Sequence, residues 1–161
     1  MALVFRKLAL TGSGRCNLTN TTIDPSKYNT DDPDKLVSCL NRYGCTEASD
    51  FYENVLGVVL EKKGDLVYPS TFKSSTVVDA LRFYISDHAI RTEFKERVVS
   101  ITEEKNIFEI KTESGRKFLS INVVIVTGGI TYPSTGSTGD VNNILDKLTD
   151  ESCFIPFRPA L

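Results

Sequence analysis

The sequence predicts an α/β fold that is α+β in part, and three observations lead to this prediction. Residues 121–126 are an almost uninterrupted run of Ile and Val, which is typical of a strand buried on both faces in a parallel sheet that helices cover. Four shorter β-branched runs precede it and indicate an antiparallel meander. Further upstream, apolar residues spaced three and four apart indicate amphipathic helices.

The first ninety residues are expected to combine helices with a short strand and a hairpin. Asp32 and Pro33 favour a helix start, because Asp caps a helix N-terminus and Pro suits the first helical position. Two alternating apolar and polar runs flank the turn at residues 62–65 and predict a hairpin. The expected elements are a strand over 4–10, helices over 32–44 and 46–55, a hairpin of 57–61 with 65–68, and a helix from Ser74 or Ser75 to His88.

The later residues are expected to be strands followed by a glycine-rich loop. Strands are expected over 90–94, 97–103, 107–112 and 116–120. The 121–126 run then leads into the loop 127–140, and an amphipathic helix is expected from about Thr138 to Leu148. Because ligands in open α/β sheets sit just beyond the carboxyl ends of the strands, this loop is an expected ligand site.

Composition excludes several classes of protein. The chain has 161 residues, of which 40% are hydrophobic and 25% charged, so intrinsic disorder is not expected. A formal net charge of −2 gives no basic field to hold nucleic acid. No apolar run approaches the roughly 20 residues of a membrane span. Four cysteines without a C-x-x-C pair and a single histidine favour free thiols, no metal site and a cytoplasmic location.

Two glycine-rich loops carry most of the functional information. The loop at 11–20 offers backbone amides without side chains, which can form an anion-binding nest, and Arg15 adds a forked cation suited to phosphate oxygens. The loop at 127–140 has four glycines and several hydroxyls, which suit a polyol or a ring system. For a single loop, a purely structural turn is the commoner interpretation. Neither loop is a Walker A or a G-x-G-x-x-G motif.

The exact amino-acid strings of the two loops are more informative about the protein family than their composition is. RKLALTGSGRCNLTN (residues 6–20) and VIVTGGITYPSTGSTGD (residues 124–140) resemble the two signature segments of the BaiN/RdsA family of NAD(P)/FAD-dependent oxidoreductases, the YhiN-like flavoproteins. GDLVYPSTFKSSTVVDAL, ERVVSITEEKNIFEIKT and FIPFRPAL resemble further segments of that family in the same order. The resemblance covers nearly the whole chain.

The resemblance implies a partial FAD/NAD(P)-binding Rossmann-like domain with the antiparallel meander. By position, the loop 12–17 would lie along the flavin's pyrophosphate and ribityl chain, and Val98 would offer backbone contacts to adenine. Residues 127–129 would end a core strand against the cofactor, with the loop 136–140 close by. The implied FAD-binding residues are Gly12, Gly14, Arg15, Cys16, Asn17, Val98, Thr127, Gly128, Gly129, Gly136, Gly139 and Asp140.

The departures from the family pattern shape the expected organisation. The family begins with a G-x-G-x-x-G unit that this sequence lacks, and Gly139-Asp140-Val141 stands where the family has Gly-Asp-Gly. We therefore expect an internal piece of a longer protein, with weak or absent FAD binding of its own. The expected single incomplete FAD-binding domain, 1–161, comprises a cofactor loop (1–30), helices and hairpin (31–88), meander (89–120), core strand with loop and helix (121–150) and the start of a connection (151–161).

Two functions are compatible with these residues. The first is a fragment of a flavoprotein oxidoreductase that binds FAD and transfers hydride from NAD(P)H to an unidentified small-molecule substrate. No catalytic residue can be assigned, since the sole histidine, His88, falls at a helix end. The alternative is a truncated, non-catalytic α+β module without a cofactor, which self-associates through exposed sheet edges. Neither a nucleic acid nor a membrane is expected as a partner.

Overall fold

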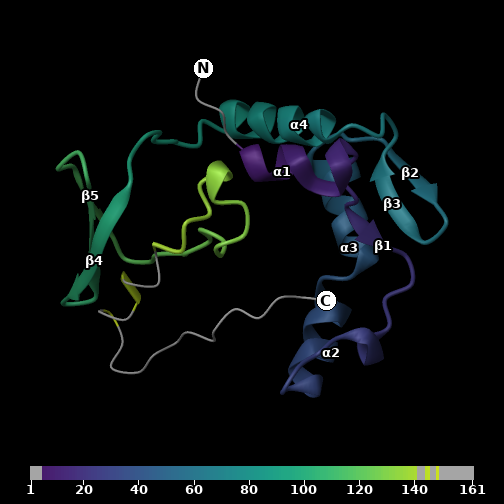
Figure 1. Ribbon diagram of the computed structural model, residues 1–161, viewed down its shortest axis with the longest axis horizontal. Coiled ribbons are helices and arrows are strands. Elements are labelled where there is room, and N and C mark those ends of the chain that lie inside the picture. Colours follow the sequence, from purple (N-terminus) through teal and green to yellow (C-terminus); the bar gives the residue numbers. More distant parts are fainter. Residues whose placement is uncertain (1–4, 141–143, 146–147, 149–161) are drawn as a thin grey trace. The chain divides into compact units, whose positions relative to one another are not determined.

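The chain forms two compact units. The computed structural model describes residues 5–140, 144, 145 and 148, and the division falls between Arg91 and Thr92 (Figure 1). The first unit is mostly helical with one small sheet, and the second is built on a separate antiparallel sheet. Within the described residues, no helix has the length and apolar character needed to cross a membrane.

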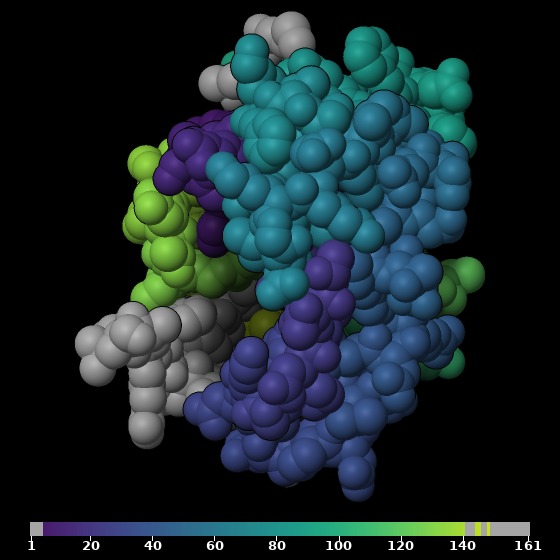
Figure 2. Space-filling model, turned by 90° about the vertical axis from the view of Figure 1, so that its right-hand side faces the viewer, coloured from purple at the N-terminus to yellow at the C-terminus, as the bar shows by residue number. Residues whose placement is uncertain are grey.

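The first unit combines four helices with a three-stranded sheet. Figure 2 views it from the side that carries α2 and the β2–β3 hairpin. The sheet is antiparallel in the order β1-β3-β2. The elements are α1 (Arg6–Leu10), β1 (Thr19–Asn20), α2 (Pro33–Arg42), α3 (Cys45–Asp50) continued by a π-helical turn (Phe51–Val55), β2 (Leu60–Lys63), β3 (Leu66–Pro69) and α4 (Ser74–Asp87), with 3-10 turns at Thr11–Gly14 and Pro25–Lys27.

Most of the predicted elements of this unit are confirmed, and their local causes are visible. A carboxylate oxygen of Asp32 accepts the backbone N–H of Lys35 at 2.9 Å, which caps α2. Gly64 takes a positive φ of 61° at the hairpin turn, a conformation that glycine adopts without steric cost. The imidazole Nδ1 of His88 lies 2.9 Å from the Tyr84 carbonyl oxygen at the end of α4, so the histidine is a helix-end residue, as expected.

The predicted strand over 4–10 is wrong, because residues 6–10 form α1. The segment Arg-Lys-Leu-Ala-Leu consists of good helix formers. The helix end is anchored by Ser74, whose hydroxyl donates to the Ala9 carbonyl at 2.6 Å. Ser74 is the first residue of α4, and Lys73 precedes it as the N-cap. This bond fixes the start of the glycine loop against α4.

The second unit is an antiparallel meander in the order β4-β5-β6. Its strands are β4 (Val98–Glu104), β5 (Ile107–Thr112) and β6 (Lys117–Ser120), which confirms three of the four predicted runs. The predicted strand over 90–94 is wrong. The Ile90 amide donates to the Ile85 carbonyl at 3.0 Å, which extends the last turn of α4, and Lys95 has a φ of 60°, which interrupts an extended path.

The predicted parallel strand over 121–126 is also wrong, because these residues form no strand in the structure. These residues belong to neither sheet, and both sheets are antiparallel. Val124 and Val126 are 82% and 84% exposed. A strand requires a neighbour to pair with its backbone, and none of the described strands pairs with this segment. In the helix expected over 138–148, residues 138–140 are not helical, whereas residues 144 and 145 are helical. Apart from Leu148, the other residues of this expected helix lie outside the described residues, as does the expected connection at 151–161.

Substitution of Ser74 tests the anchoring of the glycine loop. Ser74→Ala leaves the half-buried Ala9 carbonyl without its donor, and we expect a loss of about 1 to 2 kcal/mol in unfolding free energy. Ser75→Ala, at the exposed neighbouring position, is the matched control and should be close to neutral. Urea unfolding followed by tyrosine fluorescence reports mainly on this unit, since five of the six tyrosines precede residue 91. Equal midpoints for the two variants would contradict the anchoring role.

Candidate functional site

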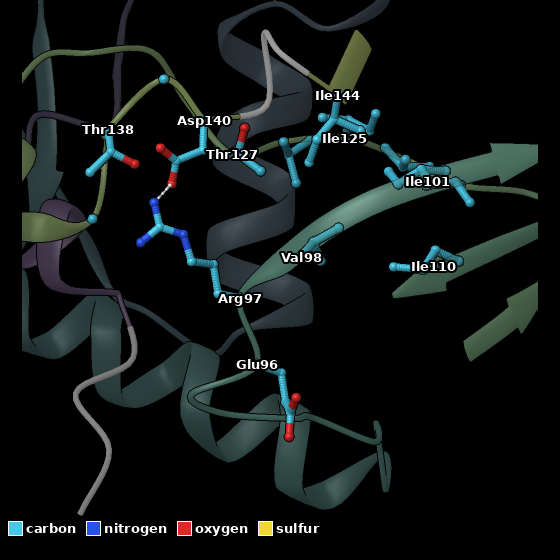
Figure 3. Close-up of a pocket in the computed structure, with 15 residues that line it drawn as sticks. Glu96, Arg97, Val98, Ile101, Ile110, Ile125, Thr127, Thr138, Asp140 and Ile144 are labelled. Atoms are coloured by element: carbon cyan, nitrogen blue, oxygen red, sulfur yellow. Dashed lines mark hydrogen bonds and ion pairs between the residues drawn. The ribbon is translucent and has the colours of Figure 1, made fainter. Parts of the chain in front are cut away.

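A cavity of about 380 Å³ lies within the second unit (Figure 3). Its size falls in the range of roughly 300 to 1,000 Å³ typical of small-molecule sites. One wall is the face of β4 and β5, and the other walls come from residues 123–127, the loop 136–140 and Ile144. The lining residues are Glu96, Arg97, Val98, Ile101, Ile110, Val123, Val124, Ile125, Val126, Thr127, Gly136, Thr138, Gly139, Asp140 and Ile144.

A β-bulge shapes the sheet wall of the cavity. Val98 and Ile101 are three residues apart, so a regular strand would place their side chains on opposite faces. The pairing shifts between Val98 and Ser100, where Val98 lies opposite Thr112 and Ser100 opposite Lys111. The extra residue restores both side chains to one face, and both line the cavity.

The facing wall is the extended segment 123–127. Val123 and Ile125 are half-buried, whereas Val124 and Val126 are largely exposed. This alternation of burial is the one expected of an extended chain with one covered face. The wall is therefore apolar, and its last residue, Thr127, brings a hydroxyl to the cavity.

The charged groups gather at one side of the cavity. Arg97, at the start of β4, forms an ion pair with Asp140 of the loop, and Figure 3 shows this pair set apart from the isoleucines. The two side chains are 56% and 43% exposed. Because the pair is half-exposed, its own contribution to stability is small. It places a carboxylate and a guanidinium side by side next to an apolar wall.

Glu96 is held away from ligand chemistry by its own partners. Its carboxylate accepts from the Ser114 hydroxyl at 2.6 Å and from the Arg116 guanidinium at 3.0 Å. Hydrogen bonds from Ser114, then Thr112 and Arg116, hold the pKa of Glu96 below its ordinary value. The Glu96 carboxylate is thus charged at neutral pH, and its oxygens already accept hydrogen bonds from Ser114 and Arg116.

The glycine loop of the first unit has a different character. Gly12 and Ser13 are both left-handed, with φ of 55° and 53°, and Cys16 has a φ of 59° while being buried. The amides of Arg15 and Cys16 donate within the loop, to the carbonyls of Gly12 and Thr11 at 3.1 and 3.2 Å. Part of the expected amide nest is therefore used internally.

The side chains of this loop divide between core and solvent. Arg15 and Asn17 are exposed, so the guanidinium is accessible to an anion. Cys16 is a free thiol packed in the core. Burial, and secondarily the electrostatic influence of the neighbouring Cys16, raise the pKa of the Tyr52 phenol. In the described part of the chain, no group of three or more His, Cys, Asp or Glu is arranged to hold a metal ion.

The structure brings some of the expected cofactor residues together. Val98, Thr127, Gly136, Gly139 and Asp140 line the cavity of the second unit. Gly128 and Gly129 follow Thr127 directly without lining it, and the loop 12–17 belongs to the first unit. Sequence reasoning missed Arg97, Ile101, Ile110, Ile125 and Ile144. Arg97 could have been found from the sequence, because it directly precedes Val98, which was expected to bind the cofactor.

Comparison with known proteins shows the family. Residues 1–151 match the family model described as HI0933-like protein Rossmann domain. The chain therefore belongs to the HI0933-like family of Rossmann-domain proteins, and the resemblance identified from the loop strings is confirmed. The mixed α/β class is likewise confirmed, with helices beside antiparallel sheets in the structure described.

Three relatives illustrate the range of the family. A 3-dehydro-bile acid delta(4,6)-reductase of Clostridium scindens is 29% identical over 134 residues, covering 83% of this chain and 32% of that protein. The ribosomal RNA dihydrouridine synthases of Escherichia coli and Haemophilus influenzae are 26% and 23% identical, each over 83% of this chain and over 33% and 34% of their own lengths. The chain thus spans about a third of the length of the relatives it matches.

Proposed function

We propose that this chain supplies FAD contacts in a flavin-dependent oxidoreductase, and that the cavity of the second unit receives the adenine end of the cofactor. The observation that carries the proposal is the convergence of Val98, Thr127, Gly139 and Asp140 on one cavity. Each of these residues was assigned to the cofactor from the sequence alone. Val98 lies 29 residues before Thr127, and Thr127 lies 12 residues before Gly139, so the convergence is a property of the fold.

The lining of the cavity fits a planar ring. Branched side chains from β4, β5 and the 123–127 segment form apolar walls, which exclude water from the faces of an aromatic system. The polar groups lie at one side, where a ring edge would need hydrogen bonds.

The residues present bind and orient rather than perform acid–base chemistry. When bound, FAD would accept a hydride from NAD(P)H and deliver it to the substrate. The titratable residues among those lining the cavity are Glu96, Arg97 and Asp140, and each is held in an ion pair. We therefore assign no catalytic acid or base to this cavity.

The substrate is proposed only as a class. By their names, one of the relatives acts on a bile acid and two act on ribosomal RNA. The net charge of −2 gives this chain no overall positive field to hold RNA by counterion release. A small molecule is therefore the substrate that we propose.

A cavity-filling substitution tests FAD binding. We expect the chain to bind FAD with a dissociation constant above about 1 µM, because no G-x-G-x-x-G loop is present to hold the pyrophosphate at a helix N-terminus. Thr127→Trp fills the cavity and should weaken binding at least about tenfold, as measured by flavin fluorescence anisotropy. Thr102→Trp, at an exposed β4 position that does not line the cavity, is the control and should bind like the parent. Equal affinities for the two variants would refute the assignment of FAD to this cavity.

Self-association through an exposed strand edge is the second candidate. The observation that favours it is the exposure of Val124 and Val126 on an extended segment without a strand partner among the described residues, since such segments pair with other chains. If this property dominates, the chain forms dimers or larger species without bound flavin.

Charges on the exposed face test this candidate. Lysine at both Val124 and Val126 should return the chain to a monomer in sedimentation analysis, because like charges oppose pairing of two copies. Thr102→Lys with Glu104→Lys, on exposed positions of β4, is the control. A monomeric parent chain would exclude self-association.

A further inference from the structure

A second cavity, of about 630 Å³, lies within the first unit, and the proposed function makes no use of it. Its volume falls in the range of roughly 300 to 1,000 Å³ typical of small-molecule sites. One wall is a face of α4, on which Thr76, Ala80, Phe83 and Asp87 recur three or four residues apart. The short side chain of Ala80 leaves a hollow between its neighbours on that face.

Another part of the wall is the end of the π-helical turn Phe51–Val55. Val55 and the next residue, Leu56, line the cavity. The Leu56 amide donates to the Phe51 carbonyl at 3.1 Å, five residues back. Such single π-helical turns are frequent at functional sites. Val55 is 45% exposed, so this part of the wall is both apolar and accessible to a ligand.

Aromatic rings form a third part of the lining. Phe83 is 74% exposed, so its ring is accessible. The rings of Tyr84 and His88 are stacked, with their centroids 4.0 Å apart and their planes at 26°. The face of a phenyl or phenol ring carries partial negative charge and attracts a cation within about 6 Å of the ring centroid. A positively charged ligand group is therefore favoured beside these rings.

His88 adds a hydrogen-bond acceptor to this lining. Its Nδ1 lies 2.9 Å from the Tyr84 carbonyl oxygen. Because a carbonyl oxygen can only accept, the proton of this hydrogen bond belongs to Nδ1. In the neutral imidazole, the other ring nitrogen, Nε2, is then an acceptor.

The charged groups of the lining have one sign. Asp79 and Asp87 contribute carboxylates, and no lysine or arginine is among the lining residues that the structure describes. Arg82 donates to one oxygen of Asp79 at 3.0 Å, whereas Asp87 lies 3.9 Å from the His88 Nδ1, which is longer than a hydrogen bond. Asp87 therefore keeps acceptor capacity for a ligand. Its side chain is 86% exposed, so water and salt moderate its attraction for a cation.

We propose that this cavity binds a small organic ammonium ion with an apolar body, such as an arylalkylamine. The apolar body packs against Val55 and Phe83, and the ammonium group donates to Asp87 beside the aromatic rings. A neutral ligand of the same shape loses the attraction to the rings and to the carboxylate. An anionic ligand meets the carboxylates with like charge. The site belongs to the first unit and does not depend on the cofactor cavity of the second.

Three ligands of similar shape and different charge test this site. The full chain is titrated with 2-phenylethylamine, 2-phenylethanol and phenylacetate at neutral pH, and the amide NMR signals of Thr76, Ala80 and Phe83 are followed. We expect a dissociation constant of about 1 mM for the amine, the range that its few atoms allow. The alcohol should bind about three- to fivefold more weakly, because it lacks the cation. Phenylacetate should bind most weakly.

Two substitutions remove the groups that recognise the cation. Phe83→Leu keeps an apolar side chain but removes the ring, and Asp87→Asn removes the charge at nearly constant shape. Each should reduce the preference for the amine over the alcohol. Asp65→Asn, the same charge change at an exposed residue of the hairpin turn that does not line the cavity, should leave this preference unchanged. The amide spectrum of each variant also reports whether it is folded.

Several results would overturn this inference and leave the proposed function standing. They are equal affinities for the amine and the alcohol, phenylacetate binding as tight as amine binding, and an amine preference that survives in both variants. Unchanged cavity signals at about 10 mM amine would overturn it as well. Nα-acetyl-lysine amide carries the same ammonium group on a protein side chain. If it binds more tightly than 2-phenylethylamine, a partner protein's lysine rather than a free amine is the occupant.

Discussion

One extra residue in the ladder between β4 and β5 makes the cavity possible. Side chains alternate along a strand, so Val98 and Ile101 share a face only because the bulge lies between them. On the partner strand, Ile110 and Thr112 are two residues apart and need no such device. Without the bulge, either Val98 or Ile101 would face away, and the sheet wall would lose one of its three apolar side chains, Val98, Ile101 and Ile110.

The extended segment 123–127 gives the second constraint. Val123 and Ile125 are half-buried beside the cavity, while Val124 and Val126 remain exposed. This segment has apolar side chains on both of its faces, and only the face that carries Val123 and Ile125 is covered by the described structure. The chain spans about a third of the length of its relatives, and it belongs to a Rossmann-domain family. The cavity forms on the covered face, from residues of a single unit.

The sequence predicted best where local interactions decide the structure. The Asp32 cap of α2 and the Gly64 turn of the hairpin involve residues close together in the chain, and both were predicted. Residues 121–126 were not, because their pattern reports the neighbours that a strand prefers and the described sheets provide none. Residues 6–10 were misassigned because a short apolar run does not distinguish a strand from a helix, although these residues are good helix formers. The Ser74 hydroxyl, 65 positions away from Ala9, then anchors the end of the helix.

The residues of the candidate site also divide into those that the sequence predicted and those that depend on contacts distant in the chain. The loop strings identified the family and with it Val98, Thr127 and Asp140, which the fold then brings to one cavity. Arg97 was missed because its partner is 43 positions away, and Ile101 was missed because a bulge cannot be seen without the pairing of the strands. The most direct test of the adenine site compares amide hydrogen exchange with FAD and with FMN, which lacks the adenine end. The account predicts that FAD, and not FMN, slows exchange at Val98, across 123–127 and at Gly139. Equal slowing by FMN, or slowing by FAD confined to other segments, would contradict it.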